Sequence, residues 1–279
     1  MPAAPHCLFQ TWFVPALVAL LLAACGGAPQ VSAEQREAQE AAYEKAKALF
    51  EEKCRTVAGE KIHRKVEGVE GVLLMKVRPA VGDRQWKDRM WPGAAFARET
   101  FGDGYINSFL GYEYSSSSTG EPVSPQRRGY INVARYPGGL PGYRFVDVID
   151  EKDGRRYRYT GRYDEPWKRD PERYSRTATF FVLERIEAPD PAPRYAVDYE
   201  DHVIPEEREM GLASTTIRVI DRQTGEILGE MLRYAWSRTG PSKNNPVPWL
   251  TAIRCPSRQW TGADTRQFVD QVLIPARDR

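Results

Sequence analysis

Short apolar or alternating runs, separated by turn residues, fill the chain after Gly59 and restrict it to a fold based on β-strands. The 22 Gly and 21 Pro of the 279 residues exceed average usage, which favours many turns over long helices. Runs of this kind bounded by Gly, Pro, Asn or Asp predict strands. The predicted strands are 71–77, 143–149, 156–163, 177–186, 195–199, 215–220, 226–236 and 249–254.

Two pairs of these runs predict β-hairpins. The first joins 143–149 to 156–163 through a turn that contains Gly154, and the second joins 215–220 to 226–236 through a turn that ends at Gly225. Glycine at such positions adopts the positive φ that tight turns need.

Helices are predicted at both ends of the strand region. Ser32 and Gln35 form a capping-box pair, and no Gly or Pro interrupts the chain from there to Val57. Apolar residues recur in this stretch at spacings of three and four, which gives the helix one buried face that includes Cys54. A short closing helix is predicted over 265–273.

The expected architecture is a single α+β domain over residues 32–279, with the N-terminal helix packed on a mostly antiparallel, hairpin-rich sheet. Residues 79–142 carry Gly and Pro at short intervals and are expected to form long loops across the sheet. Long loops in a compact domain usually have a role, so this region is one place to look for function.

Charge and composition exclude two classes of protein. Lys and Arg number 40 against 38 Asp and Glu, and the net charge of +2 argues against a nucleic-acid-binding protein. Hydrophobic residues make up 41% and charged residues 28%, which excludes a chain that is disordered throughout.

An uncharged run from Trp12 to Ala24 ends at Cys25. The run is shorter than the ~20 apolar residues that span a bilayer, and it contains Pro15, so a cleaved signal is favoured. The sequence Leu-Ala-Ala-Cys at 22–25 resembles the lipobox of bacterial lipoproteins. The resemblance implies a signal peptide over 1–24, acylation of Cys25 and a short tether over 25–31. The alternatives are an ordinary secretory signal cut at an Ala-x-Ala-like site, or a misassigned start codon.

Lipidation would tether the domain to a membrane through Cys25, because two or more acyl chains give stable anchoring. Gly26 follows the cysteine where Asp would signal retention in the inner membrane. By resemblance to Gram-negative sorting patterns, this implies an outer-membrane lipoprotein whose domain faces the periplasm.

The cysteines reduce to one pair in the mature chain. Cys7 leaves with the signal peptide and Cys25 is acylated, so Cys54 and Cys255 remain. In an oxidising compartment an isolated pair usually forms a disulfide, which we predict here; two buried free thiols are the alternative.

No catalytic, metal or cofactor site is predicted. Only His63 and His202 survive signal removal, and the chain has neither an HExxH nor a GxSxG motif. His202 follows an acidic run that could offer oxygens to calcium, but the Gly-punctuated loop of such sites is missing and a solvated charged edge is favoured. Paired carboxylates can catalyse hydrolysis alone, so a hydrolase without a recognisable motif stays an alternative.

Two charged segments are candidate binding surfaces. Residues 155–176 contain eight basic and four acidic residues, with tyrosines interleaved, and Arg and Tyr are enriched at protein interfaces. Anionic lipid headgroups are a second possible partner, and a solvated hairpin without a binding role is the third interpretation. The candidate binding residues are Arg156, Tyr157, Arg158 and Tyr159 in the basic segment and Asp198, Glu200 and Asp201 in the acidic one.

The chain resembles an uncharacterised family of Gram-negative lipoproteins in four segments: 54–79, 143–150, 214–230 and the Cys255-Pro256 pair. Lipoproteins of this build include immunity proteins that neutralise antibacterial toxins, an analogy of location and architecture. The leading hypothesis is therefore a membrane-tethered, non-catalytic protein-binding module that neutralises a toxin. A structural or assembly lipoprotein of the outer membrane is the second hypothesis, and a hydrolase is the third.

Overall fold

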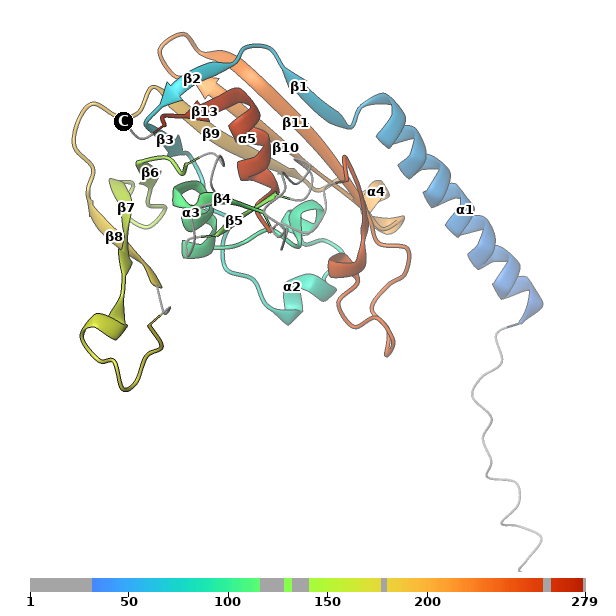
Figure 1. Ribbon diagram of the computed structural model, residues 1–279. Helices are drawn as coiled ribbons and strands as arrows, with labels where there is room; N and C mark the ends of the chain where they lie inside the picture. Colours follow the sequence, from blue (N-terminus) through green and yellow to red (C-terminus); the bar gives the residue numbers. More distant parts are fainter. Residues whose placement is uncertain (1–31, 116–127, 132–140, 177–179, 258–261, 278–279) are drawn as a thin grey trace, which may run out of the picture. The chain divides into compact units, whose positions relative to one another are not determined.

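The computed structural model of the protein describes residues 32–115, 128–131, 141–176, 180–257 and 262–277 (Figure 1). The chain divides into two compact units, Met1–Ala42 and Tyr43–Arg279. Helix α1 (Ala33–Thr56) contributes residues to both units. In the first unit, the Ser32 hydroxyl accepts the Gln35 amide at 3.1 Å and the Gln35 side chain accepts the Ser32 amide at 3.0 Å, which confirms the predicted capping box.

The second unit is built on a nine-stranded sheet, and the α+β prediction is confirmed. The strands follow the order β1-β11-β10-β9-β3-β6-β7-β8, and β12 also pairs with β11. Pairing is antiparallel except where β3 lies parallel to β6 and β9. The strands of this sheet are β1 (Gly59–Ile62), β3 (Gly71–Leu74), β6 (Phe145–Ile149), β7 (Arg156–Asp164), β8 (Phe180–Glu187), β9 (Tyr195–His202), β10 (Leu212–Asp221), β11 (Glu226–Trp236) and β12 (Ile253–Cys255).

Both predicted hairpins are confirmed. β6 pairs with β7 around Gly154, and β10 pairs with β11 around Gly225, each glycine having a positive φ. Two small sheets accompany the large one. They are β2 (Val66–Val69) with β13 (Leu273–Pro275), and β4 (Tyr112–Ser115) with β5 (Arg128–Ile131).

The expectation of long loops over 79–142 was wrong for the described part of this region. Helical segments α2, η1 and α3 lie there, and Phe96, Tyr105 and Phe109 from them are buried. These segments have only five to eight residues, too few for a helical period to stand out against the Gly and Pro that flank them. The helices described in this unit after α1 are α2 (Asp83–Lys87), η1 (Pro92–Phe96), α3 (Asp103–Leu110), η3 (Pro166–Lys168), α4 (Pro205–Glu209), η4 (Pro248–Thr251) and α5 (Asp264–Val272).

The main core lies on one face of the sheet. Tyr199, Ile217 and Met231 stand side by side on adjacent strands, and they pack with Phe96 of η1 and Phe268 of α5. Helices η1 and α5 thus cover this face of the sheet, which we call the inner face. The helix predicted over 265–273 is α5.

The opposite, outer face of the sheet is covered at one end by the part of α1 that belongs to this unit, Tyr43–Thr56. Phe50 of the helix lies 5.7 Å from Trp236 of β11, measured between ring centroids, and Ala46 and Tyr234 join the same cluster. The predicted disulfide is confirmed here, because Cys54 in the last turn of α1 is bonded to Cys255 of β12.

Candidate functional site

The predicted lipidation site lies outside the described residues. The described residues begin at Ser32, after the predicted signal peptide (1–24), Cys25 and the tether (25–31). Within the described residues, every helix is too short or too polar to cross a bilayer.

The candidate arginines of β7 are held inside the protein. Arg158 donates two hydrogen bonds to the Asp147 carboxylate, at 2.7 and 3.0 Å, and Arg156 approaches the same carboxylate at 3.6 Å. The Asp147 side chain is fully buried, and those of Arg156 and Arg158 are only 16% and 18% exposed. Much of their charge therefore neutralises a buried carboxylate of the neighbouring strand.

The candidate tyrosines lie on the opposite face of β7, because successive side chains of a strand alternate between its faces. The guanidinium of Arg185, from β8, stacks on Tyr157 at 3.6 Å from the ring centroid and pairs with Asp150 at 2.8 Å. Tyr159 is partly buried against the main core. The Arg and Tyr residues thus do not form one surface.

Alternation also divides the acidic run of β9. Asp198 and Glu200 lie on the outer face, where Asp198 pairs with Lys76 at 3.4 Å and Glu200 with Arg218 at 3.0 Å. Asp201 points to the inner face. There it accepts the Thr215 hydroxyl at 2.6 Å and pairs with the buried Arg78 at 3.3 Å; the sequence pattern predicted neither contact.

His202 ends the same strand on the outer face. Its Nε2 atom lies 2.8 Å from the Thr216 hydroxyl, and its Nδ1 atom is 3.9 Å from Glu200. Among the described residues no three His, Cys, Asp or Glu side chains converge as metal ligands would.

Strands β7 and β8 continue beyond the rest of the sheet as a two-stranded ribbon. β6 pairs with β7 only over Arg156–Tyr159, whereas β8 pairs with β7 over Tyr157–Asp164. Among the described residues, therefore, no third strand lies beside the ribbon segments Thr160–Asp164 and Phe180–Glu184 (Figure 1). Phe181 closes over Gly161 at the centre of the ribbon, where any Cβ would overlap its ring.

β8 is an edge strand of the large sheet. The Ala188 amide donates to Arg156 at 2.9 Å, and in an antiparallel pair the hydrogen-bonded positions alternate. The amides and carbonyls of Leu183, Arg185 and Glu187 therefore point away from β7, and they have no backbone partner among the described residues.

Two large apolar side chains lie exposed on this edge strand. Phe180 is 51% and Ile186 59% exposed, and both are on the face of the ribbon that also carries the Arg162–Glu184 ion pair. An exposed strand edge with apolar side chains beside it is a template for pairing with another chain. The sequence showed the strand, but a strand's place at the edge of a sheet depends on distant pairings.

A network of charged side chains is buried between the inner face and η1. The Arg78 guanidinium lies between the rings of Phe96 and Tyr199, at 4.4 and 4.1 Å from their centroids. The guanidinium of Arg233 also lies over the Phe96 ring, and it pairs with Asp264 of α5. Burial raises the pKa of Tyr199 to about 12, so this phenol stays protonated at neutral pH.

Glu99 is the titratable group of this network with a pKa near neutrality. One carboxylate oxygen accepts the amide and the hydroxyl of Thr265, at 2.9 and 2.8 Å, while the other has no hydrogen-bond partner in the described structure. Burial, together with the carboxylate of Asp264, raises the pKa of Glu99 to about 7, although Arg78 opposes the shift.

We expect Glu99 to make stability depend on pH. Its pKa in the folded protein, about 7, lies above the usual value of 4.5, so between these values the folded state binds a proton that the unfolded state has released. The free energy of unfolding should therefore fall as pH rises through this window, by up to about 1.4 kcal/mol per pH unit relative to Glu99→Gln. Denaturant unfolding of both proteins from pH 4 to 8 measures the difference, and parallel curves would contradict it.

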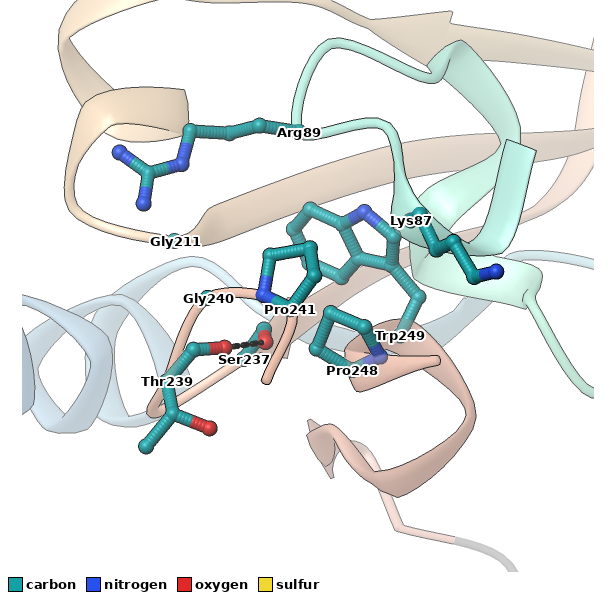
Figure 2. Close-up of a pocket in the computed structure, with 9 residues that line it drawn as sticks. All are labelled: Lys87, Arg89, Gly211, Ser237, Thr239, Gly240, Pro241, Pro248 and Trp249. Carbon is teal, nitrogen blue, oxygen red and sulfur yellow. Dashed lines mark hydrogen bonds between the residues drawn. The ribbon is translucent and has the colours of Figure 1, made fainter. Parts of the chain in front are cut away.

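A small open pocket lies on another part of the unit, where the segment after α2 meets the segment after β11. The space between its walls is about 240 Å³, part of which is open solvent. Figure 2 shows the indole of Trp249 between the side chains of Arg89 and Lys87, with the rings of Pro241 and Pro248 beside it. The indole is fixed in place because its N–H donates to the Asp88 carbonyl at 2.7 Å. The remaining lining residues are Gly211, Ser237, Thr239 and Gly240.

Comparison of the chain with protein-family models, with curated proteins and with solved structures finds no match. The fold and the side-chain geometry described above are therefore the basis for inferring a function.

Proposed function

We propose that this protein is an envelope lipoprotein, tethered through Cys25, that binds another protein along the free edge of β8. The single observation that carries the binding role is the unpaired edge at Leu183, Arg185 and Glu187, flanked by exposed Phe180 and Ile186. An added strand would gain main-chain hydrogen bonds from the edge and apolar contacts from the two side chains. The Cys54–Cys255 disulfide supports an oxidising compartment, as the envelope is.

The partner we propose is an extended segment of a different protein. The edge carries charges at Glu184, Arg185 and Glu187, and charged residues on an edge strand oppose pairing between identical copies. Neutralisation of a toxin by stoichiometric binding is the sharpest form of this role. In the cell, we expect the complex to be held at the membrane surface by the lipid anchor.

Site-specific crosslinking tests where the partner binds. The full-length protein, with a photoreactive amino acid at position 187, is expressed in the cells that naturally make it. Irradiation should yield one crosslinked protein, which mass spectrometry identifies. The same residue at position 61, on the opposite edge strand β1, serves as the matched control. Equal crosslinking at both positions, or crosslinks only between copies of this chain, would contradict the proposal.

The edge pairing predicts a difference between two substitutions at one position. Glu187→Pro removes an outward N–H without touching the ladder between β7 and β8, whereas Glu187→Ala keeps that N–H. We expect the proline variant to bind the crosslinked partner at least about fivefold more weakly than the alanine variant, the equivalent of one backbone hydrogen bond. Titration of the purified partner measures both affinities, and equal values would rule out strand addition.

A further inference from the structure

Arg185 lies on the free edge of β8, and contacts within the protein orient its guanidinium. The guanidinium stacks on the ring of Tyr157, at 3.6 Å from the centroid, and its Nη2 atom donates to Asp150 at 2.8 Å. Its Nε and Nη1 atoms donate to no acceptor among the described residues, and the side chain is 42% exposed. Arg185 therefore offers unused donors from a preorganised position, which lowers the entropic cost of binding a carboxylate.

A strand added to this edge would place one of its side chains against Arg185. The amide and carbonyl of Arg185 point away from β7, so they would bond to the main chain of the added strand at this position. In an antiparallel pair, the residue directly opposite lies on the same face, with its Cβ atom about 4.5–5.5 Å away. A carboxylate there would reach the unused guanidinium nitrogens, whereas a lysine would be repelled.

The acidic residues of the edge strand already have basic partners. Glu187 is on the same face as Arg185, two residues along the strand, and Arg155 lies 4.0 Å from its carboxylate. Glu184 points to the opposite face, where Arg162 pairs with it at 2.9 Å. An acidic residue opposite Arg185 therefore adds one charge-assisted contact without meeting an unpaired carboxylate of β8.

The opposite face of the edge strand favours an apolar residue beside the acidic one. Ile186 is 59% exposed on this face, and the two neighbours of the acidic residue point to it because side chains alternate. One of these neighbours lies opposite Ile186 whether the added strand is parallel or antiparallel. An apolar side chain there would remove part of Ile186 from water, which a polar side chain would do less favourably.

We propose that the β8 edge selects an extended segment that has an acidic residue opposite Arg185 and, next to it, an apolar residue in contact with Ile186. Arg185 then determines the charge preference, and Ile186 determines the apolar preference. The inference rests on the proposed function, because it specifies which strand the β8 edge accepts.

Four peptides with blocked ends test this preference. The reference peptide, Thr-Thr-Val-Glu-Val-Thr-Thr, reads the same in both directions and so suits either strand orientation. Gln or Lys replaces its Glu in the second and third peptides. Thr replaces both Val residues in the fourth, which keeps the β-branched shape and removes apolar surface.

The full-length protein in detergent micelles is titrated with each peptide, and the ¹H–¹⁵N signals of the Leu183, Arg185 and Glu187 amides are followed. The amides of Glu184 and Ile186, which point toward β7, are the internal reference. We expect the reference peptide to shift the three outward amides saturably. The Gln and Thr peptides should bind about threefold more weakly, and the Lys peptide at least about tenfold more weakly.

Two arginines of similar exposure provide the protein variants. Arg185 is 42% exposed and pairs with Asp150, and Arg144 is 46% exposed and pairs with Glu70, away from β8. Arg185→Gln should abolish the preference for the Glu peptide over the Gln peptide, and Arg144→Gln should preserve it. The peptide series on the unaltered protein tests the same preference without any substitution.

The outcomes separate this inference from the proposed function. Equal binding of the Glu and Gln peptides would overturn the acidic preference, yet saturable shifts of the outward amides would still support strand addition. The inference is also overturned if Arg185→Gln keeps the preference, if the Thr peptide binds as tightly as the reference, or if no peptide shifts these amides. In the last case, crosslinking from position 187 decides by itself whether the proposed function stands.

Discussion

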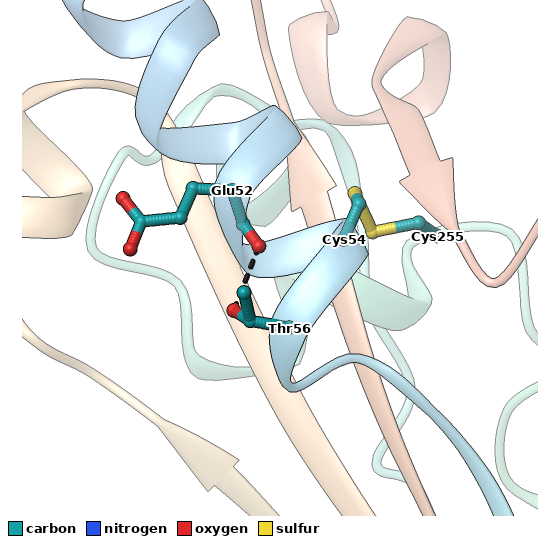
Figure 3. Close-up of a disulfide and its surroundings, with 4 residues drawn as sticks. All are labelled: Glu52, Cys54, Thr56 and Cys255. Atoms are coloured by element: carbon teal, nitrogen blue, oxygen red, sulfur yellow. Dashed lines mark hydrogen bonds between the residues drawn. A yellow bond between two sulfur atoms is a disulfide. The ribbon is translucent and has the colours of Figure 1, made fainter.

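Loss of the disulfide between Cys54 and Cys255 is expected to lower the free energy of unfolding by as much as about 5 kcal/mol. The bond joins residues 201 positions apart, and a crosslink that closes so long a loop removes much of the conformational freedom of the unfolded chain. Figure 3 shows it tying the last turn of α1 to β12. Since domains are typically stable by only ~5–15 kcal/mol, this loss would leave little stability.

Denaturant unfolding of the Cys54→Ser/Cys255→Ser protein measures the effect against the oxidised wild type. The reduced wild type should match the double variant, and adding reductant to the double variant should change nothing. An equal free energy of unfolding for the oxidised and reduced wild type would show that the crosslink does not stabilise the fold.

Local signals in the sequence were enough to predict most elements of the sheet. The hairpin from β10 to β11 is an example, since two alternating runs flank a turn whose Gly225 has a φ of 74°. The Cys54 position was predictable too, because helical spacing places it on the apolar face of α1. Such features depend on neighbours within a few residues, and periodicity records them directly.

Pairings between distant segments were not predictable. The parallel contacts of β3 with β6 and β9 join residues more than 70 positions apart, and no turn signal marks them. The edge position of β8 follows from these same pairings. Likewise Glu99 looks like an ordinary charged residue in the sequence, and only its burial beside Asp264 gives it an unusual pKa.

The candidate binding residues show how clustering along a strand misleads. Arg156 and Arg158 are close in sequence to Tyr157 and Tyr159, yet the two kinds of side chain occupy opposite faces of β7. The same alternation separates Asp201 from its neighbours on β9, as its bond to Thr215 of the inner face shows. Their role in binding a partner stays a prediction.

Arg266→Met is expected to lower the free energy of unfolding by about 3–5 kcal/mol, the usual cost of removing one partner of a buried ion pair. Arg266 is fully buried in α5 and pairs with Asp270 at 2.6 Å. Its guanidinium also donates to the carbonyls of Ser108, at 2.8 Å, and Phe109, which belong to the last turn of α3. A cation at this position satisfies carbonyls that have no partner within the helix and faces the negative end of the helix dipole.

A double-mutant cycle separates the two contributions of Arg266. Asp270→Asn removes the carboxylate charge, so in the Arg266→Met background it relieves the cost of a buried carboxylate that has lost this cation but restores nothing to the α3 carbonyls. We therefore expect the double variant to be more stable than the sum of the single effects predicts, by at least about 1 kcal/mol, yet well below the wild type. Strictly additive losses in urea unfolding would mean that the ion pair contributes nothing to stability.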